Sequence, residues 1–303
     1  MQNLRNSIME ISKGVFMNSG LCLSVSGGGI LGVGPAHYLA RLEGDLKCPL
    51  YERLIAQSGT STGSILAGGM AEGISAVEME NLYIEEGRKI FTKYPWYKRL
   101  LPTCPPFDNS NLKKILQDKF KGKVGEWSKP TFIPCVYMNG ASDEKIWDNN
   151  DAEDKWFAIL TSCAAPTYFD VIVDTIGRSF CDGGLWANSC PDDLMAGMYA
   201  KGQRNIRILN LETGMTTPPL NIKGNQTMLG WAKYILKHWV ARSSKAAAFR
   251  CKAVMGEKNF FNVAPVVHNS FDMDDVSCIQ SIIEIWDKQY DEDREKLLKF
   301  VNP

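Results

Sequence analysis

Short apolar runs alternate with amphipathic segments along much of the chain. Residues 20–26 and 53–58 are apolar runs with the length and pattern of buried strands. Each run leads into a glycine-containing turn and then into a helix-like segment, at 34–44 and 64–73 respectively. This repeated strand–turn–helix unit predicts a parallel sheet with helices on its faces.

The remaining pattern extends this architecture without dividing the chain. We expect strands at 131–139, 144–148, 168–173, 178–184 and 205–212, and helices at 76–91, 108–120, 152–165, 225–253 and 275–300. Residues 92–108 are rich in proline, aromatic and basic residues and are predicted to form a loop or lid. We find no internal repeat and no low-complexity linker. A single domain over 1–303 is therefore expected, with a core at about 20–212 and a helical C-terminal extension at about 220–303.

Charge and hydropathy exclude several classes of protein. The chain has 34 basic and 34 acidic residues, which argues against a nucleic-acid polymer as its partner. Its first 16 residues include Arg5, Glu10 and Lys13, so they predict a short amphipathic helix rather than a secretory signal. No apolar run reaches the ~18 residues that a membrane-spanning helix needs.

The cysteines indicate a reducing compartment. There are nine of them, an odd number, with no Cys-x-x-Cys pair. Several, such as Cys22 and Cys135, lie inside apolar runs. We therefore expect reduced thiols in a cytoplasmic protein, and the spacing predicts no zinc site.

Residues 59–63, Gly-Thr-Ser-Thr-Gly, stand between a predicted strand and a predicted helix. A nucleophile on such a sharp turn needs small neighbours on both sides, because larger ones would clash with the strand and the helix. The turn would aim the Ser61 hydroxyl along the N-terminus of the following helix, where the dipole favours developing negative charge. The pattern predicts a nucleophilic Ser61, and a glycine-rich turn without chemistry is the alternative.

Residues 26–32, Ser-Gly-Gly-Gly-Ile-Leu-Gly, also follow a predicted strand. Successive N–H groups at Gly27, Gly28 and Gly29 could bind an oxyanion or a phosphate. The glycines also match the string of a dinucleotide-binding loop, but that loop requires an acidic residue at a strand end about 20 residues later. The nearest acids, Glu43 and Asp45, lie at a predicted helix end, so an oxyanion loop is favoured.

Asp182 ends a predicted strand and is followed by two glycines. A carboxylate in that position can point into a cleft and take a proton directly from a nucleophilic serine. Asp-Gly is also a common turn dipeptide, so this segment alone predicts function weakly.

Three segments, in this order, resemble the hallmarks of the patatin-like phospholipase family, in its bacterial form: GGGILG at 27–32, GTSTG at 59–63 and DGG at 182–184. The stretch SCAAPTYFD at 162–170 resembles the family's apolar segment before the aspartate, and Asn188 stands where the family has an asparagine after DGG. The family usually has Arg or Lys just before the last glycine of the loop, whereas this chain has Leu31.

The resemblance implies an α/β protein, with a three-layer α/β/α sandwich and a mostly parallel central sheet. It implies a lipid acyl hydrolase in which Ser61 attacks the ester carbonyl, Asp182 is the base and the N–H groups of residues 27–29 hold the oxyanion. It implies no metal and no organic cofactor.

A Ser–His–Asp triad is the alternative mechanism. The chain has three histidines, His37, His238 and His268. Chain order would allow His238 or His268 to complete a triad. His238 falls within a predicted helix, whereas His268 follows an apolar run and is better placed.

The predicted helix at 233–252 has no acidic residue among its cations, which are Lys233, Lys237, Arg242, Lys245, Arg250 and Lys252. This helix could present a solvated face, lie on an anionic membrane or bind a phosphate-bearing regulator. Some small bacterial members of the family are switched on by a cyclic nucleotide, and the size of this chain is compatible with that. The aromatic residues of 92–108 could also meet lipid.

The sequence therefore predicts a cytoplasmic phospholipase A-type enzyme that contacts a phospholipid membrane and cleaves its fatty-acyl esters. A cyclic nucleotide could activate it, and it could form a homo-oligomer. The alternative from another class is a non-catalytic ligand-binding protein that keeps the fold. The presence of both Ser61 and Asp182 argues against that alternative.

Overall fold

The sheet is organised around β1 (Gly20–Val25), in which every residue after Gly20 is buried. The computed structural model describes residues 19–101, 104–140, 144–214, 228–267 and 271–302. In α9 (Met228–Met255) it describes the side chains from residue 240 onward. Within these residues the strand order is β5-β6-β3-β2-β1-β7-β8, and β4 pairs with β3. The other strands are β2 (Leu54–Gly59), β3 (Thr131–Tyr137), β4 (Glu144–Trp147), β5 (Ile172–Val173), β6 (Ser179–Asp182), β7 (Ile206–Leu211) and β8 (Phe260–Val263).

Parallel pairing brings three strand ends to one edge of the sheet. β1 pairs in parallel with both β2 and β7, and its last residue, Val25, lies between Gly59 and Leu211. The segments that follow these three strands therefore begin side by side. In parallel α/β sheets this carboxyl edge is where ligands bind.

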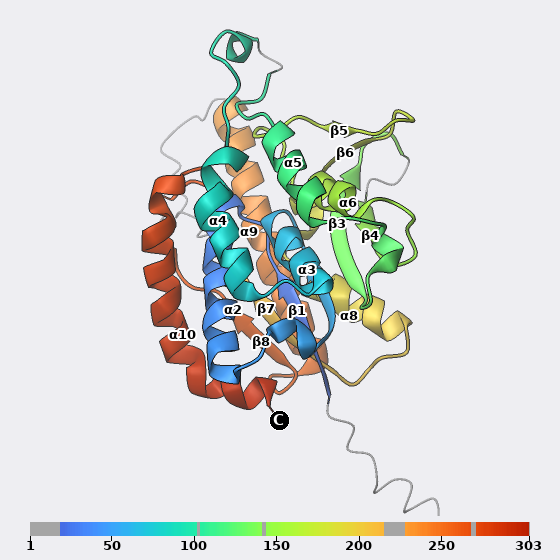
Figure 1. Cartoon of the computed structure of the whole chain (residues 1–303), viewed down its shortest axis with the longest axis vertical. Helices are drawn as coiled ribbons and strands as arrows, with labels where there is room; N and C mark the ends of the chain where they lie inside the picture. The colour runs from blue at the N-terminus through green and yellow to red at the C-terminus, as the bar shows by residue number, and fades with distance from the viewer. Residues whose placement is uncertain (1–18, 102–103, 141–143, 215–227, 268–270, 303) are drawn as a thin grey trace, which may run out of the picture.

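Helices cover both faces of the sheet (Figure 1). Leu21, Leu23 and Val25 of β1 belong to the larger core, which α2, α4 and α10 complete, whereas Cys22 faces the smaller core beneath α8 and α9. The helices are α2 (Val33–Leu46), α3 (Thr62–Glu72), α4 (Ala76–Ile90), α5 (Ser110–Lys119), α6 (Lys155–Ser162), α7 (Gly184–Ala187), α8 (Pro191–Ala200), α9 (Met228–Met255) and α10 (Ile279–Val301). The predicted α/β/α sandwich is confirmed.

The structure differs from the expected elements in several places, one of which is the pair of helices α7 and α8, where no helix was predicted. The sheet is parallel from β3 to β8 but antiparallel where β4, β6 and β5 join it. The first helix continues past Gly44 to Leu46, and the C-terminal extension contributes strand β8 as well as helices. None of the described helices has an apolar stretch long enough to cross a bilayer. The amphipathic helix predicted within residues 1–16 lies outside the described residues.

Two glycine substitutions should have opposite effects on stability. A Cβ at Gly59 would overlap the carbonyl group of Gly63, so Gly59→Ala should lower the free energy of unfolding by at least about 3 kcal/mol. Gly44 is exposed on α2 with no atom near its Cβ position, so Gly44→Ala should raise that free energy by about 0.5–1 kcal/mol. Urea unfolding of both variants measures the difference, and equal effects would contradict the close approach at Gly59.

Candidate active site

Ser61 lies on the turn between β2 and α3 and has a backbone conformation that residues other than glycine rarely adopt. Its φ is 53° and its ψ is −126°. The two flanking glycines make the turn possible, because a Cβ at Gly63 would overlap the carbonyl of Val25, as one at Gly59 would overlap Gly63. Strain of this kind costs on the order of 1–3 kcal/mol and is concentrated at functional sites.

Hydrogen bonds fix the main chain on both sides of this serine. The Ser61 N–H donates to the hydroxyl of Ser162 at 3.0 Å, and that hydroxyl donates to the Pro134 carbonyl at 2.6 Å. The Ser61 carbonyl accepts from the hydroxyl of Ser64 at 2.6 Å. The strained turn is therefore held by its neighbours, and the Ser61 N–H is already occupied.

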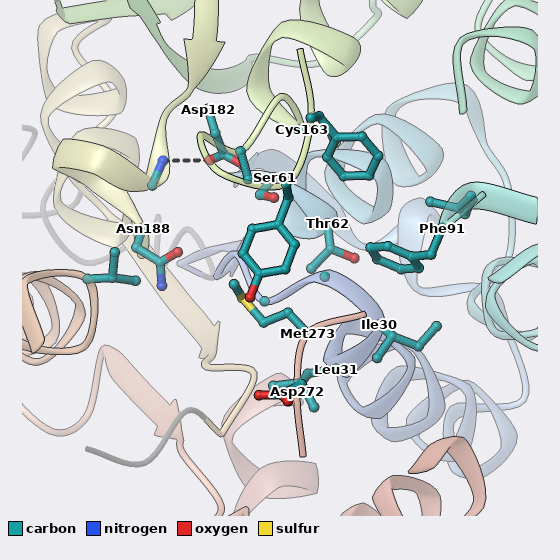
Figure 2. Close-up of a pocket in the computed structure, with 18 of the residues that line it drawn as sticks. Ile30, Leu31, Ser61, Thr62, Phe91, Cys163, Asp182, Asn188, Asp272 and Met273 are labelled. Atoms are coloured by element: carbon teal, nitrogen blue, oxygen red, sulfur yellow. Dashed lines mark hydrogen bonds between the residues drawn. The ribbon is translucent and has the colours of Figure 1, made fainter. Parts of the chain in front are cut away.

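Asp182 ends β6 and lies beside Ser61 (Figure 2). Its side chain is buried, its Oδ1 accepts a hydrogen bond from the Gly184 N–H at 2.7 Å, and the side chain of Ser61 lies beside it in the same cavity lining. Burial raises the pKa of Asp182 to about 7, although the Gly184 N–H and the side chain of Ser61 oppose the rise. A carboxylate with a pKa near neutrality is suited to accept a proton from a serine hydroxyl.

The glycine loop after β1 is held at both of its ends. The Gly27 N–H donates to the Asn188 carbonyl at 2.8 Å, and the Gly27 carbonyl accepts from the Thr213 hydroxyl at 2.6 Å. The Ile30 N–H donates to the Met273 carbonyl at 2.8 Å. Gly27 is therefore not available as an oxyanion donor, which corrects the predicted set.

Two donors of the predicted oxyanion hole remain. Among the residues that the structure describes, the N–H groups of Gly28 and Gly29 have no hydrogen-bond acceptor, and both glycines line the same cavity as Ser61. Gly29 has a φ of +59°, a conformation that glycine adopts without strain. The candidate oxyanion hole thus consists of Gly28 and Gly29.

These residues open onto a cavity of about 550 Å³ with mostly apolar walls. Figure 2 shows Ser61 and Asp182 together on one side, with Phe91, Ile30 and Leu31 on the other. No lysine or arginine lines it among the described residues. Leu31, which replaces the family's usual cation, is buried in the cavity wall.

Sequence comparison shows the family of the chain. The family model for the patatin-like phospholipases matches residues 23–195, more than half of the chain. This protein belongs to the patatin-like phospholipase family.

Curated relatives include phospholipases from bacteria and animals. The chain is 32% identical over 177 residues to a cGAMP-activated phospholipase of Pseudomonas aeruginosa, a match that covers 55% of this chain and 53% of that protein. It is 26% identical to a cUMP-AMP-activated phospholipase of Escherichia coli, covering 67% and 68% respectively. It is 28% identical to an intracellular phospholipase A2 of Caenorhabditis elegans, covering 59% and 17%. The chain therefore spans about half the length of the Pseudomonas relative and much less of the nematode one.

Of the three histidines in this patatin-like protein, the structure describes the side chain of His37 alone. His37 on α2 is hydrogen-bonded to Glu80 of α4 at 2.7 Å and to Asp287 of α10 at 2.9 Å, so it links three helices. It does not line the cavity. The side chain of His238 and the whole of His268 lie outside the described residues, so the triad alternative is untested at both.

Sequence reasoning found some residues of this patatin-like site and missed others. Ser61, Asp182 and Asn188 were marked by glycine-rich local patterns. The roles of Ser162 and Thr213 were not predicted, although Ser162 lies in a stretch that resembles the family. Thr213 follows β7 without any local signal, and 186 residues separate it from Gly27.

The pKa of Asp182 predicts the pH dependence of activity. If Asp182 must be ionised to accept the serine proton, kcat/KM should fall as the pH drops through about 7 and level off above it. Hydrolysis of a water-soluble short-chain ester between about pH 5 and about pH 9 measures this. If kcat/KM instead falls with an apparent pKa near 4, the ordinary range of aspartate, the assignment of Asp182 as a buried base is contradicted.

Proposed function

We propose that this protein is a phospholipase A-type lipid acyl hydrolase that uses Ser61 and Asp182 as a catalytic dyad. The observation that carries the proposal is the placement of Ser61, held at positive φ on its turn, beside the buried carboxylate of Asp182 in the lining of one apolar cavity. Burial raises the pKa of that carboxylate to about 7. Membership of a phospholipase family supports the reaction class. The free N–H groups of Gly28 and Gly29 beside them supply what an acyl-transfer site requires.

The proposed reaction has two steps. The Ser61 Oγ attacks the acyl carbonyl carbon while Asp182 takes the hydroxyl proton, and Gly28 and Gly29 stabilise the negative oxygen. Asp182 then returns the proton to the departing alcohol, which leaves a lysophospholipid and an acylated Ser61. In the second step a water molecule gives its proton to Asp182 and attacks the acyl carbon. The fatty acid is released and the proton returns to Ser61.

The apolar lining of the cavity is our reason for placing the fatty-acyl chain of the substrate inside it. Its lining is largely apolar and includes Ile65, Ile90, Leu112 and Phe169. Burial of apolar surface favours an acyl chain there, at roughly 0.8 kcal/mol for each CH₂ group. A phosphate inside the cavity would meet no cation among the described lining residues, so we place the headgroup outside it.

We further propose that the enzyme works on the membrane surface and that a cyclic dinucleotide activates it. Two relatives are named as cGAMP-activated and cUMP-AMP-activated phospholipases, which supports this type of regulator. On α9, which contains the predicted basic segment 233–252, Arg250 forms an ion pair with Asp192 and Lys252 forms one with Glu257. These two cations are therefore less available for a membrane or a phosphate than the sequence predicted.

The dyad predicts a specific pattern of inactivation. Ser61→Ala should abolish labelling by a fluorophosphonate, and Asp182→Asn should lower fatty-acid release by about 10³-fold or more. Release should be measured from mixed phospholipid vesicles, with and without cGAMP and cUMP-AMP.

Histidine variants are the matched controls. His238→Ala and His268→Ala should keep activity within about tenfold, because neither belongs to the proposed dyad. A loss of about 10³-fold in His268→Ala alone would establish a triad instead. Protein that is neither labelled at Ser61 nor active on vesicles with any cyclic dinucleotide would support a non-catalytic ligand-binding role.

A further inference from the structure

The segment between α4 and α5 leaves large apolar side chains in solvent. Trp96, Tyr97, Leu100 and Leu101, here called the apolar tip, are all exposed, and Leu100 reaches 72%. In Figure 1 this segment projects from the body at the end opposite the start of β1. Exposed clusters of this kind mark surfaces that bind a partner or a membrane.

Positive charge surrounds the apolar tip. Lys93, Lys98 and Arg99 lie in or beside it, and residues 92–107 contain no acidic residue. Within the part of the chain that the structure describes, none of these three cations forms an ion pair. The Lys98 ammonium lies 5.2 Å from the centre of the Tyr94 ring. The surface therefore combines exposed apolar groups with unneutralised positive charge.

We propose that the apolar tip inserts into an anionic phospholipid bilayer, an inference that rests on the proposed lipase function. Tryptophan and tyrosine favour the interface between headgroups and acyl chains, and nearby cations are attracted to anionic lipids. A second copy of the chain fits this surface less well. A symmetric contact would place the same cations against each other.

The base of the segment is joined to the wall of the active-site cavity. The Tyr94 hydroxyl donates to Asp170 at 2.6 Å, and the Tyr94 N–H donates to the Pro106 carbonyl at 3.0 Å. Phe107 stacks on Tyr168 and contacts Phe169, both of which line the cavity. Insertion of the apolar tip would therefore hold this wall of the cavity against the bilayer.

Vesicle binding tests the proposal without hydrolysis. In the Ser61→Ala background, the double variant Trp96→Ala/Leu100→Ala should bind vesicles of equal phosphatidylglycerol and phosphatidylcholine about tenfold more weakly. Lys98→Ala/Arg99→Ala should weaken binding to these vesicles in low salt and leave binding to pure phosphatidylcholine unchanged. Phe249→Ala is the matched control, because Phe249 is as exposed, at 72%, but lies on α9.

Activity separates this proposal from the proposed function. With Ser61 present, Trp96→Ala/Leu100→Ala should lower fatty-acid release from vesicles but keep hydrolysis of a soluble short-chain ester within about twofold. Unchanged vesicle binding, or an equal loss in Phe249→Ala, would overturn the proposal. So would a tip variant that changes a dimer into a monomer without changing vesicle binding. Loss of the soluble esterase in Ser61→Ala tests the catalytic function independently.

A separate observation concerns how the oxyanion loop is oriented. The hydroxyl of Thr213 donates to the Gly27 carbonyl, and the Cβ position of Gly28 would overlap the Thr213 side chain. The Gly27 carbonyl and the Gly28 N–H belong to one planar trans peptide, in which they point in opposite directions. Holding the carbonyl therefore fixes the direction of the N–H.

We infer that Thr213 is a positioning residue for the Gly28 oxyanion donor, and this inference also rests on the proposed function. Thr213 is buried and does not line the cavity, so it would act through the Gly27–Gly28 peptide alone. Loss of one oxyanion donor lowers kcat by about 10²–10³-fold, and loss of its orientation should approach the lower figure.

Removal of only the hydroxyl tests this role. Thr213→Val should lower kcat on a soluble ester by about 10–100-fold with little change in KM, and Thr213→Ser should restore most of it. Affinity for a trifluoromethyl ketone, which forms an oxyanion with the serine, should fall by a similar factor. An unchanged kcat in Thr213→Val, or a Thr213→Ser variant as impaired as Thr213→Val, would overturn the inference.

Discussion

The close approach of backbone to backbone at the end of β2 is the constraint on which the site depends. Gly59 and Gly63 must lack side chains because carbonyl groups occupy the space that a Cβ would need. The turn between them then holds Ser61 at positive φ and starts α3 directly after it. Because β1 and β7 end at the same edge, the glycine loop and Thr213 are brought to this serine by sheet register rather than by sequence proximity.

Burial then gives the site its chemistry. Among the cavity-lining residues that the structure describes, no arginine or lysine lies beside Asp182, so desolvation raises its pKa instead of a cation lowering it. The same lack of cations leaves the cavity suited to an apolar chain. A positive side chain at the position of Leu31 would favour the ionised form of nearby carboxylates and bring charge into the cavity wall. The apolar residue is thus compatible with both a neutral-range base and an acyl chain.

The sequence predicted those parts of the site that adjacent residues encode. The turn around Ser61 and the glycines after Asp182 are contiguous patterns with a steric reason for each small residue. The Ser162 hydroxyl and Thr213 could not be found in this way, since their partners are 101 and 186 residues away. Gly27 was predicted as a donor because a glycine run shows which N–H groups are accessible, not which are already bonded. The antiparallel placement of β6 and β5 was not predicted for a related reason, because strand direction is set by pairing partners.

The residues that hold the glycine loop after β1 include some beyond the segment that matches the family model. The family match ends at residue 195, whereas Thr213 and Met273 both contact the loop through hydrogen bonds. The Met273 carbonyl accepts from the Ile30 N–H, and Met273 also occupies the space beside Gly29. Any movement of the segment around Met273 would therefore change the conformation of the loop that contains both proposed donors. Ser162 holds the turn of Ser61, whereas Thr213 and Met273 hold the glycine loop, so different distant residues position the two halves of the candidate site.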